Sequence, residues 1–96
     1  MRKLFELRCP NPGKLETFLV EFSGLVLELK QHKQEVGEDM AIQLLTRATE
    51  TVAELKPVMA AWMAAHDGRN AKALYKLFEL TGEQHRQETI DKVLKN

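Results

Sequence analysis

This sequence has few of the residues from which cross-links, membrane spans and strongly charged surfaces are built. It contains one cysteine, Cys9, so no internal disulfide can form. Its longest run without a polar side chain, residues 57–65, is too short to span a bilayer. The 14 acidic and 14 basic side chains cancel, so net charge does not direct the chain to nucleic acid or membranes. With no signal-type apolar region after the first methionine, we expect a reducing, cytoplasmic location and no membrane partner.

Residues suited to catalysis or metal binding are equally sparse. His32, His66 and His85 lie far apart and no second cysteine is present, so no metal-ligand spacing occurs. Ser23, the only serine, has no nucleophile motif around it, and Cys9 lies in or beside an N-terminal segment that we expect to be mobile. The glycines are scattered, whereas a phosphate-binding loop needs them clustered. We therefore predict that the protein is not an enzyme and uses no metal or cofactor.

The remaining composition is that of a globular domain. Hydrophobic residues make up 44% of the chain and charged residues 29%, well away from the composition of disordered chains. We predict one all-α domain over residues 1–96, a compact bundle of about four helices. The predicted helices lie near residues 12–36, 39–66, 70–80 and 82–95, after an extended N-terminal segment over residues 1–11.

The N-terminal segment has the alternation expected of a strand. Phe5, Leu7 and Cys9 fall on one side of a two-residue period, and Leu4 breaks it. Because a lone strand leaves its backbone groups unpaired, we expect this segment to pair with its copy in a dimer or to form a flexible arm.

The first helix is predicted from its cap and from a long apolar face. Asn11 suits the N-cap, and Pro12 suits the first helical position, where an N–H is not needed. Apolar residues then recur three and four apart as far as Val36. Residues 15–30 also permit two strands around a turn at Ser23-Gly24, but a half-exposed hairpin would place Leu19 and Val26 on the wrong face. We prefer the helix.

The second helix is predicted to be long and kinked. Its apolar pattern keeps one phase from Ala41 to Met63, across Pro57, and Gly68 suits its C-cap. Because proline deletes a backbone hydrogen bond and crowds the preceding turn, we expect a kink at Pro57. Asn70 can cap a third helix that ends before Gly82.

A fourth helix is predicted from a second cap, and the core follows from the apolar faces. Thr81 and Gln84 form a capping-box pattern that would begin a helix at Gly82. The predicted core comprises Leu15, Phe18, Leu19, Phe22, Val26, Leu29, Leu44, Leu45, Val52, Leu55, Met59, Trp62, Leu74, Leu77, Phe78, Ile90 and Leu94.

Residues 57–65 are the most unusual stretch, because a helix without polar side chains must be covered on all sides. Either it runs through the middle of the bundle or it forms an interface, for which tryptophan and methionine are well suited. The predicted protein interface is Met59, Trp62 and Met63, together with Phe5 and Leu7 of the N-terminal segment. We accordingly predict a protein–protein interaction module of the adaptor, assembly chaperone or inhibitor type, self-associating as a homodimer.

Nucleic-acid binding is the alternative function. Residues 70–95 resemble a helix-turn-helix in outline, with Gln84, Arg86 and Gln87 at the start of its last helix. Arg2 and Lys3 belong to an N-terminal stretch of net positive charge. Against this reading, acidic residues on the same last helix oppose phosphate contacts. The alternative is therefore a small nucleic-acid-binding regulator.

Overall fold

The computed structural model describes residues 2–65 and 70–95, and all regular secondary structure in these residues is helical. The elements in chain order are α1 (Arg2–Glu6), the 3-10 turn η1 (Pro12–Lys14), α2 (Leu15–Gln31), α3 (Glu38–Ala48), the 3-10 turn η2 (Ala53–Leu55), α4 (Lys56–Ala64) and α5 (Ala71–Lys95). The prediction of an all-α bundle is confirmed. The alternative hairpin is wrong, because α2 runs through Ser23-Gly24 without a break.

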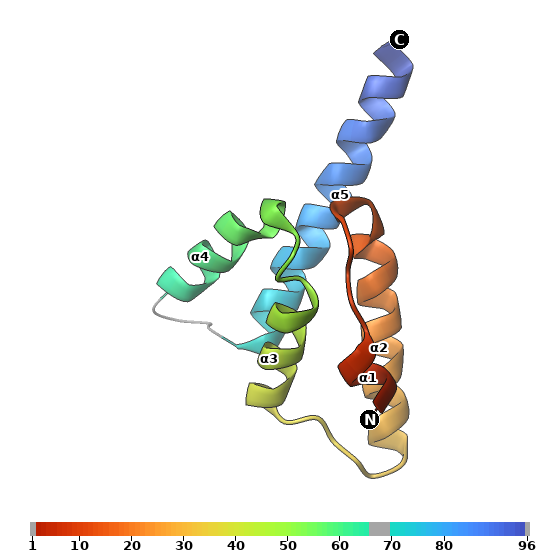
Figure 1. Cartoon of the computed structure of the whole chain (residues 1–96), viewed down its shortest axis with the longest axis vertical. Coiled ribbons are helices and arrows are strands. Elements are labelled where there is room, and N and C mark those ends of the chain that lie inside the picture. Colours follow the sequence, from red (N-terminus) through yellow and green to blue (C-terminus); the bar gives the residue numbers. More distant parts are fainter. Residues whose placement is uncertain (1, 66–69, 96) are drawn as a thin grey trace.

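Helix α5 is the central element of the bundle. Helices α2, α3 and α4 all pack against it, and α1 packs on α2. Figure 1 shows α2 and α5 side by side in opposite directions, with the C-terminal end of α5 extending beyond every other element. The N-terminal end of α2 meets α5 at Gly82, where a Cβ would lie 3.5 Å from Leu15 Cγ. Residues 83–95, here called the C-terminal arm, begin beside η1 and the first turn of α2 and then project beyond them.

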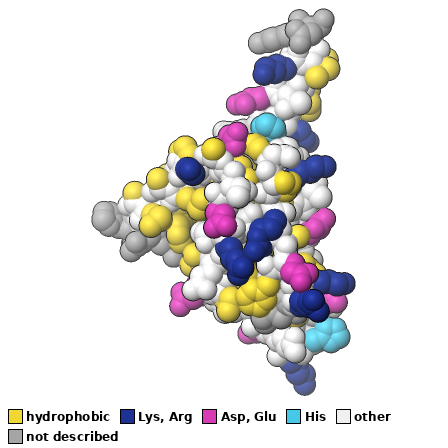
Figure 2. All heavy atoms as spheres, viewed as in Figure 1, with side chains coloured by type: hydrophobic (Ala, Val, Ile, Leu, Met, Phe, Trp, Pro, Cys, Tyr) yellow, Lys and Arg dark blue, Asp and Glu magenta, His cyan; other side chains and the backbone are white. Residues whose placement is uncertain are grey.

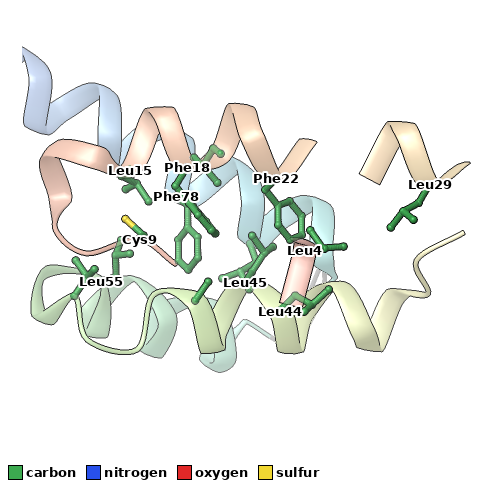
Figure 3. Packing of buried hydrophobic residues seen from close by; sticks show 14 residues of the cluster. Leu4, Cys9, Leu15, Phe18, Phe22, Leu29, Leu44, Leu45, Leu55 and Phe78 are labelled. Carbon is green, nitrogen blue, oxygen red and sulfur yellow. The ribbon is translucent and has the colours of Figure 1, made fainter. Parts of the chain in front are cut away.

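The core lies between α2, α3 and α5. Phe78 is fully buried among Leu15, Leu45 and Leu55, as Figure 3 shows. Tyr75 joins α5 to α2, because its hydroxyl donates to the carbonyl of Leu19 at 2.9 Å. Each large apolar side chain taken out of water in this way stabilises the fold by about 1.5–3 kcal/mol.

Most of the predicted core is buried, with three kinds of exception. Ile90 and Leu94 were expected in the core and are exposed. Ile90 only borders a hollow beside η1 and the first turn of α2, and Leu94 lies a turn further along the C-terminal arm. Four predicted core residues are only half-buried: Val26, Met59, Trp62 and Leu77. The predicted core list also omitted four residues that are buried: Leu4, Cys9, Ala48 and Thr49.

The predicted N-terminal strand is wrong. Residues 2–6 form α1, and only residues 7–11 lack helical structure. Leu4, which broke the strand pattern, is the buried residue of this helix. The backbone N–H of Cys9 then donates to the carbonyl of Ala48 at 2.9 Å and ties the following residues to the end of α3. The burial of Leu4 in a helix is therefore what the fold favours, and the alternation of Phe5, Leu7 and Cys9 does not produce a strand.

Helix α2 ends earlier than predicted, at Gln31 instead of near Val36. Lys33 has a positive φ of 61°, the conformation of a left-handed C-cap. The N–H of Gln34 donates to the carbonyl of Leu29 at 2.8 Å, and that of Lys33 to Lys30 at 3.0 Å. This is a Schellman motif with lysine in the position usually taken by glycine. Because lysine and not glycine occupies this position, the sequence gives no glycine signal for this helix end.

The long kinked helix predicted over residues 39–66 is also wrong, because the chain turns between α3 and α4. Thr49 is buried, and its hydroxyl donates to the carbonyl of Leu45 at 2.8 Å at the end of α3. Val52 and Leu55 then reach the core from the turn and from η2. Pro57 lies in the first turn of α4, where its missing N–H costs nothing. Gly68, the expected C-cap, lies outside the described residues.

The two predicted C-terminal helices form a single helix, α5. Asn70 caps it as predicted, since its Oδ1 accepts the N–H of Ala73 at 2.8 Å. The predicted capping box at Thr81 is wrong, because the Thr81 hydroxyl donates backwards to the carbonyl of Leu77 at 2.8 Å within the helix. Gly82 is buried mid-helix against α2, so this glycine permits a close helix contact and does not end a helix.

Candidate functional site

Cys9 is the first candidate for chemistry, and its surroundings do not activate it. The thiol is buried and donates to the carbonyl of Asn11 at 3.3 Å. Burial raises the pKa of Cys9 above its ordinary value, against a smaller opposite effect of that hydrogen bond. A nucleophilic cysteine needs a lowered pKa and access to solvent, and Cys9 has neither. Its position indicates a structural residue.

We expect the Cys9 thiol to react with an aromatic disulfide reagent at least tenfold more slowly in the native protein than in denaturant. The reagent reacts with the thiolate, and in the native protein the Cys9 thiol is protonated and buried.

The raised pKa of Cys9 also predicts that the stability of the protein depends on pH. The folded state holds the proton more tightly than the unfolded state, so this contribution to stability is present at neutral pH and is lost as alkaline pH passes through the folded pKa. Urea unfolding across this range, with Cys9→Ala as control, tests this. A loss of equal size in both proteins would contradict it.

An apolar hollow of about 260 Å³ lies between α2, α3 and the start of α5. Phe22, Val26, Leu45 and Tyr75 supply much of its wall, and Lys72 is the one charged residue among the described residues that line it. Ser23 lies at the same hollow and is exposed. Such walls suit an apolar group, and no described residue that lines the hollow is a histidine or an acidic side chain.

The predicted interface residues do not form one surface. Met59 and Trp62 are half-buried against the core, and the Trp62 indole N–H donates to the carbonyl of Asn70 at 3.1 Å. Met63 is 63% exposed on α4. The stretch over residues 57–65 is therefore partly packed and partly surface.

Phe5 and Leu7, the other two predicted interface residues, are also half-buried against the core. Phe5 belongs to α1, which packs on α2, whereas α4 packs on α5. The predicted interface thus divides between two regions of the molecule.

The residues of the nucleic-acid alternative are also dispersed. Arg2 pairs with Glu6 at 3.2 Å within α1, and Arg86 Nε lies 3.1 Å from the carboxylate of Glu16. Lys3, Gln84 and Gln87 are exposed on α1 and α5, and no helix-turn-helix places them together, since α5 is continuous. Figure 2 shows basic and acidic side chains interspersed on the visible face. The helix-turn-helix predicted over residues 70–95 is therefore wrong, and nucleic-acid binding itself stays a prediction.

The C-terminal arm carries the surface that sequence reasoning missed. Ile90, Val93 and Leu94 are 42%, 70% and 78% exposed, and Leu80 just before the arm is 50% exposed. Leu80 and Leu94 are separated by two heptads, so both lie on one side of α5. This spacing is readable in the sequence, but only once Gly82 is known not to end the helix.

The chain was compared with protein-family models, curated proteins and solved structures. None matches. The function must therefore be inferred from the surfaces of this chain.

The described residues offer neither a metal cluster nor a membrane span. Within residues 2–65 and 70–95, no three histidine, cysteine or acidic side chains gather where they could hold a metal ion. No helix of these residues has both the length and the apolar character needed to cross a membrane. The exposed apolar residues of the C-terminal arm thus remain the strongest candidate site.

Proposed function

We propose that this chain is a non-enzymatic protein-interaction module that associates with itself through α5. The observation that carries the proposal is the C-terminal arm, whose end extends beyond the body (Figure 1). Its apolar side chains Ile90, Val93 and Leu94 are exposed. Burying apolar surface gains about 25 cal/mol per Å². The arm obtains little of this gain within its own chain, so contact with another protein supplies it.

The shape of the arm favours a helical partner over a small ligand. A projecting helix offers a long, narrow face, and amphipathic helices commonly recognise other helices through residues three and four apart. The body is joined to the arm by the Arg86–Glu16 ion pair, whose side chains are 56% and 44% exposed. Such a pair contributes at most about 1 kcal/mol. Because this ion pair alone fixes the arm only weakly, contact with a second chain would also hold the arm in position against the body.

A module of this kind serves as an adaptor, assembly chaperone or inhibitor, and α4 offers a second surface for a different protein. Met63 and the small side chains of Ala60 and Ala64 are exposed there, beside the half-buried Trp62. We further propose a cytoplasmic location, because a reducing compartment suits a chain whose single cysteine has no disulfide partner.

Light scattering over a concentration series tests self-association. The measured mass of the wild-type protein is expected to rise from that of one chain towards that of two. The double variant Ile90→Asp/Leu94→Asp is expected to remain monomeric, because a buried unpaired charge costs several kcal/mol and each 1.4 kcal/mol changes the dissociation constant tenfold. Its helical circular dichroism should be unchanged, since both positions are exposed.

Val20→Asp provides the matched control, because Val20 is 71% exposed but lies on α2. This variant should associate like the wild type. A wild-type protein that stays monomeric at every concentration would overturn the proposal of self-association.

A further inference from the structure

The outward side of α5 carries a continuous stripe of residues with heptad spacing. We define the outer stripe as Lys76, Leu80, Glu83, Gln87, Ile90 and Leu94, in which successive members are alternately four and three residues apart. This is the spacing of the a and d positions that meet when two helices pack along their length. At 1.5 Å per residue the stripe is about 27 Å long.

The outer stripe lies on the side of α5 opposite to its core residues, and only Ile90 among its members borders a hollow shared with Glu16 and Thr17 of α2. Leu74 and Phe78, which bury α5 in the core, lie on the opposite side of the helix at 100° per residue. The polar members of the stripe are exposed, and its apolar members Leu80, Ile90 and Leu94 are 50%, 42% and 78% exposed. The stripe therefore presents apolar side chains that a second helix can contact.

We propose that the occupant of the outer stripe is α5 of a second copy of this chain, packed antiparallel, with Leu80 of each copy against Ile90 of the other. This inference rests on the self-association proposed above and specifies its partner, direction and register. The twofold axis then passes near residue 85. Glu83 of each copy faces Gln87 of the other, and Leu94 lies against the aliphatic stem of Lys76.

The charges of the stripe favour this antiparallel direction. Parallel pairing in register would place Lys76 against Lys76 and Glu83 against Glu83 of the second copy, and like charges at facing positions are destabilising. Antiparallel pairing removes both of these like-charge contacts, because it places Lys76 against Leu94 and Glu83 against Gln87 of the second copy. The carboxylate of Glu83 accepts a hydrogen bond from the amide of Gln87, and Asp91 lies within one helical turn of Lys76.

The same axis brings together the two copies of Arg86, which lie beside the stripe. Each Arg86 keeps its own partner, Glu16, at 3.1 Å, so this contact joins two neutral pairs and not two bare cations. The stripe remains half polar, with Lys76, Glu83 and Gln87 among its members. The dimer should consequently dissociate on dilution.

Disulfide trapping tests the register. A disulfide requires Cα atoms roughly 4.4–6.8 Å apart, a distance that facing positions of paired helices approach. Leu80→Cys and Ile90→Cys are prepared separately, oxidised alone and oxidised as an equimolar mixture. The mixture is expected to give at least tenfold more cross-linked dimer than either variant alone. The wild type controls for Cys9, which is buried.

The outcomes separate this inference from the proposed function. Efficient cross-linking of Leu80→Cys with itself would overturn the antiparallel register in favour of a parallel one. No cross-linking from the mixture, in a protein that scatters light as a dimer, would overturn pairing along the outer stripe and leave self-association standing. A protein that is monomeric by light scattering would overturn both.

Discussion

Replacing Phe78 with alanine is expected to lower the free energy of unfolding by about 3–5 kcal/mol. Phe78 is fully buried between α2 and α3, in the middle of the cluster that Figure 3 shows. Its removal loses the free energy gained by burying a large aromatic ring. It also leaves a cavity that the surrounding helices fill only in part. Because small domains have only about 5–15 kcal/mol of total stability, this loss would bring the protein close to unfolding at ambient temperature.

Urea denaturation followed by circular dichroism measures this loss, and Val93→Ala is the matched control. Val93 belongs to the same helix but is 70% exposed, so its substitution should change the free energy of unfolding by less than about 0.5 kcal/mol. Equal losses in the two variants would contradict the assignment of Phe78 to the core and Val93 to the arm.

Replacing Gly82 with valine is expected to destabilise the protein by about 1–3 kcal/mol, although glycine is itself a poor helix former. A Cβ at position 82 would lie 2.9 Å from Glu16 Cγ and 3.5 Å from Leu15 Cγ. The branched side chain of valine extends this overlap, so α2 and α5 must separate or Glu16 must leave Arg86. Either movement loosens the contact between the two helices.

Gly24→Ala is the counterpart within the same protein. Gly24 also lies mid-helix, but no atom would come within 4 Å of a Cβ there. Alanine should therefore stabilise the protein by about 1 kcal/mol through helix propensity alone. Thermal or urea unfolding of both variants tests the contrast. A Gly82→Val protein as stable as the wild type would show that α2 and α5 do not need this close approach.

Helix α2 illustrates what can be predicted from sequence. Its apolar residues recur with the helical period, and this period alone identified the buried face that includes Leu15, Phe18 and Phe22. Asn70 was likewise recognisable as a cap, because its side chain acts on a backbone N–H only three residues away. Such features depend on neighbours along the chain, so local patterns are sufficient to find them.

The candidate site was harder to predict, because it depends on where helices break. Reading Gly82 as a helix end divided α5 in two and hid the outer stripe that joins Leu80 to Leu94. Reading Pro57 as a kink concealed the real turn at residues 49–52. Glycine and proline each fit more than one structural role, and the role is chosen by contacts with residues distant in sequence.

The sequence by itself determined an all-α protein, the inner face of most of its helices and the absence of familiar catalytic motifs, because periodicity and composition are local properties. Only the tertiary structure decided that Gly82 lies within one long helix and that Leu94 lies outside the core. The physical reason is that burial depends on which elements meet in space. Helix α2 begins opposite Gly82, and the apolar residues of α5 at positions 90, 93 and 94, beyond that point, remain exposed.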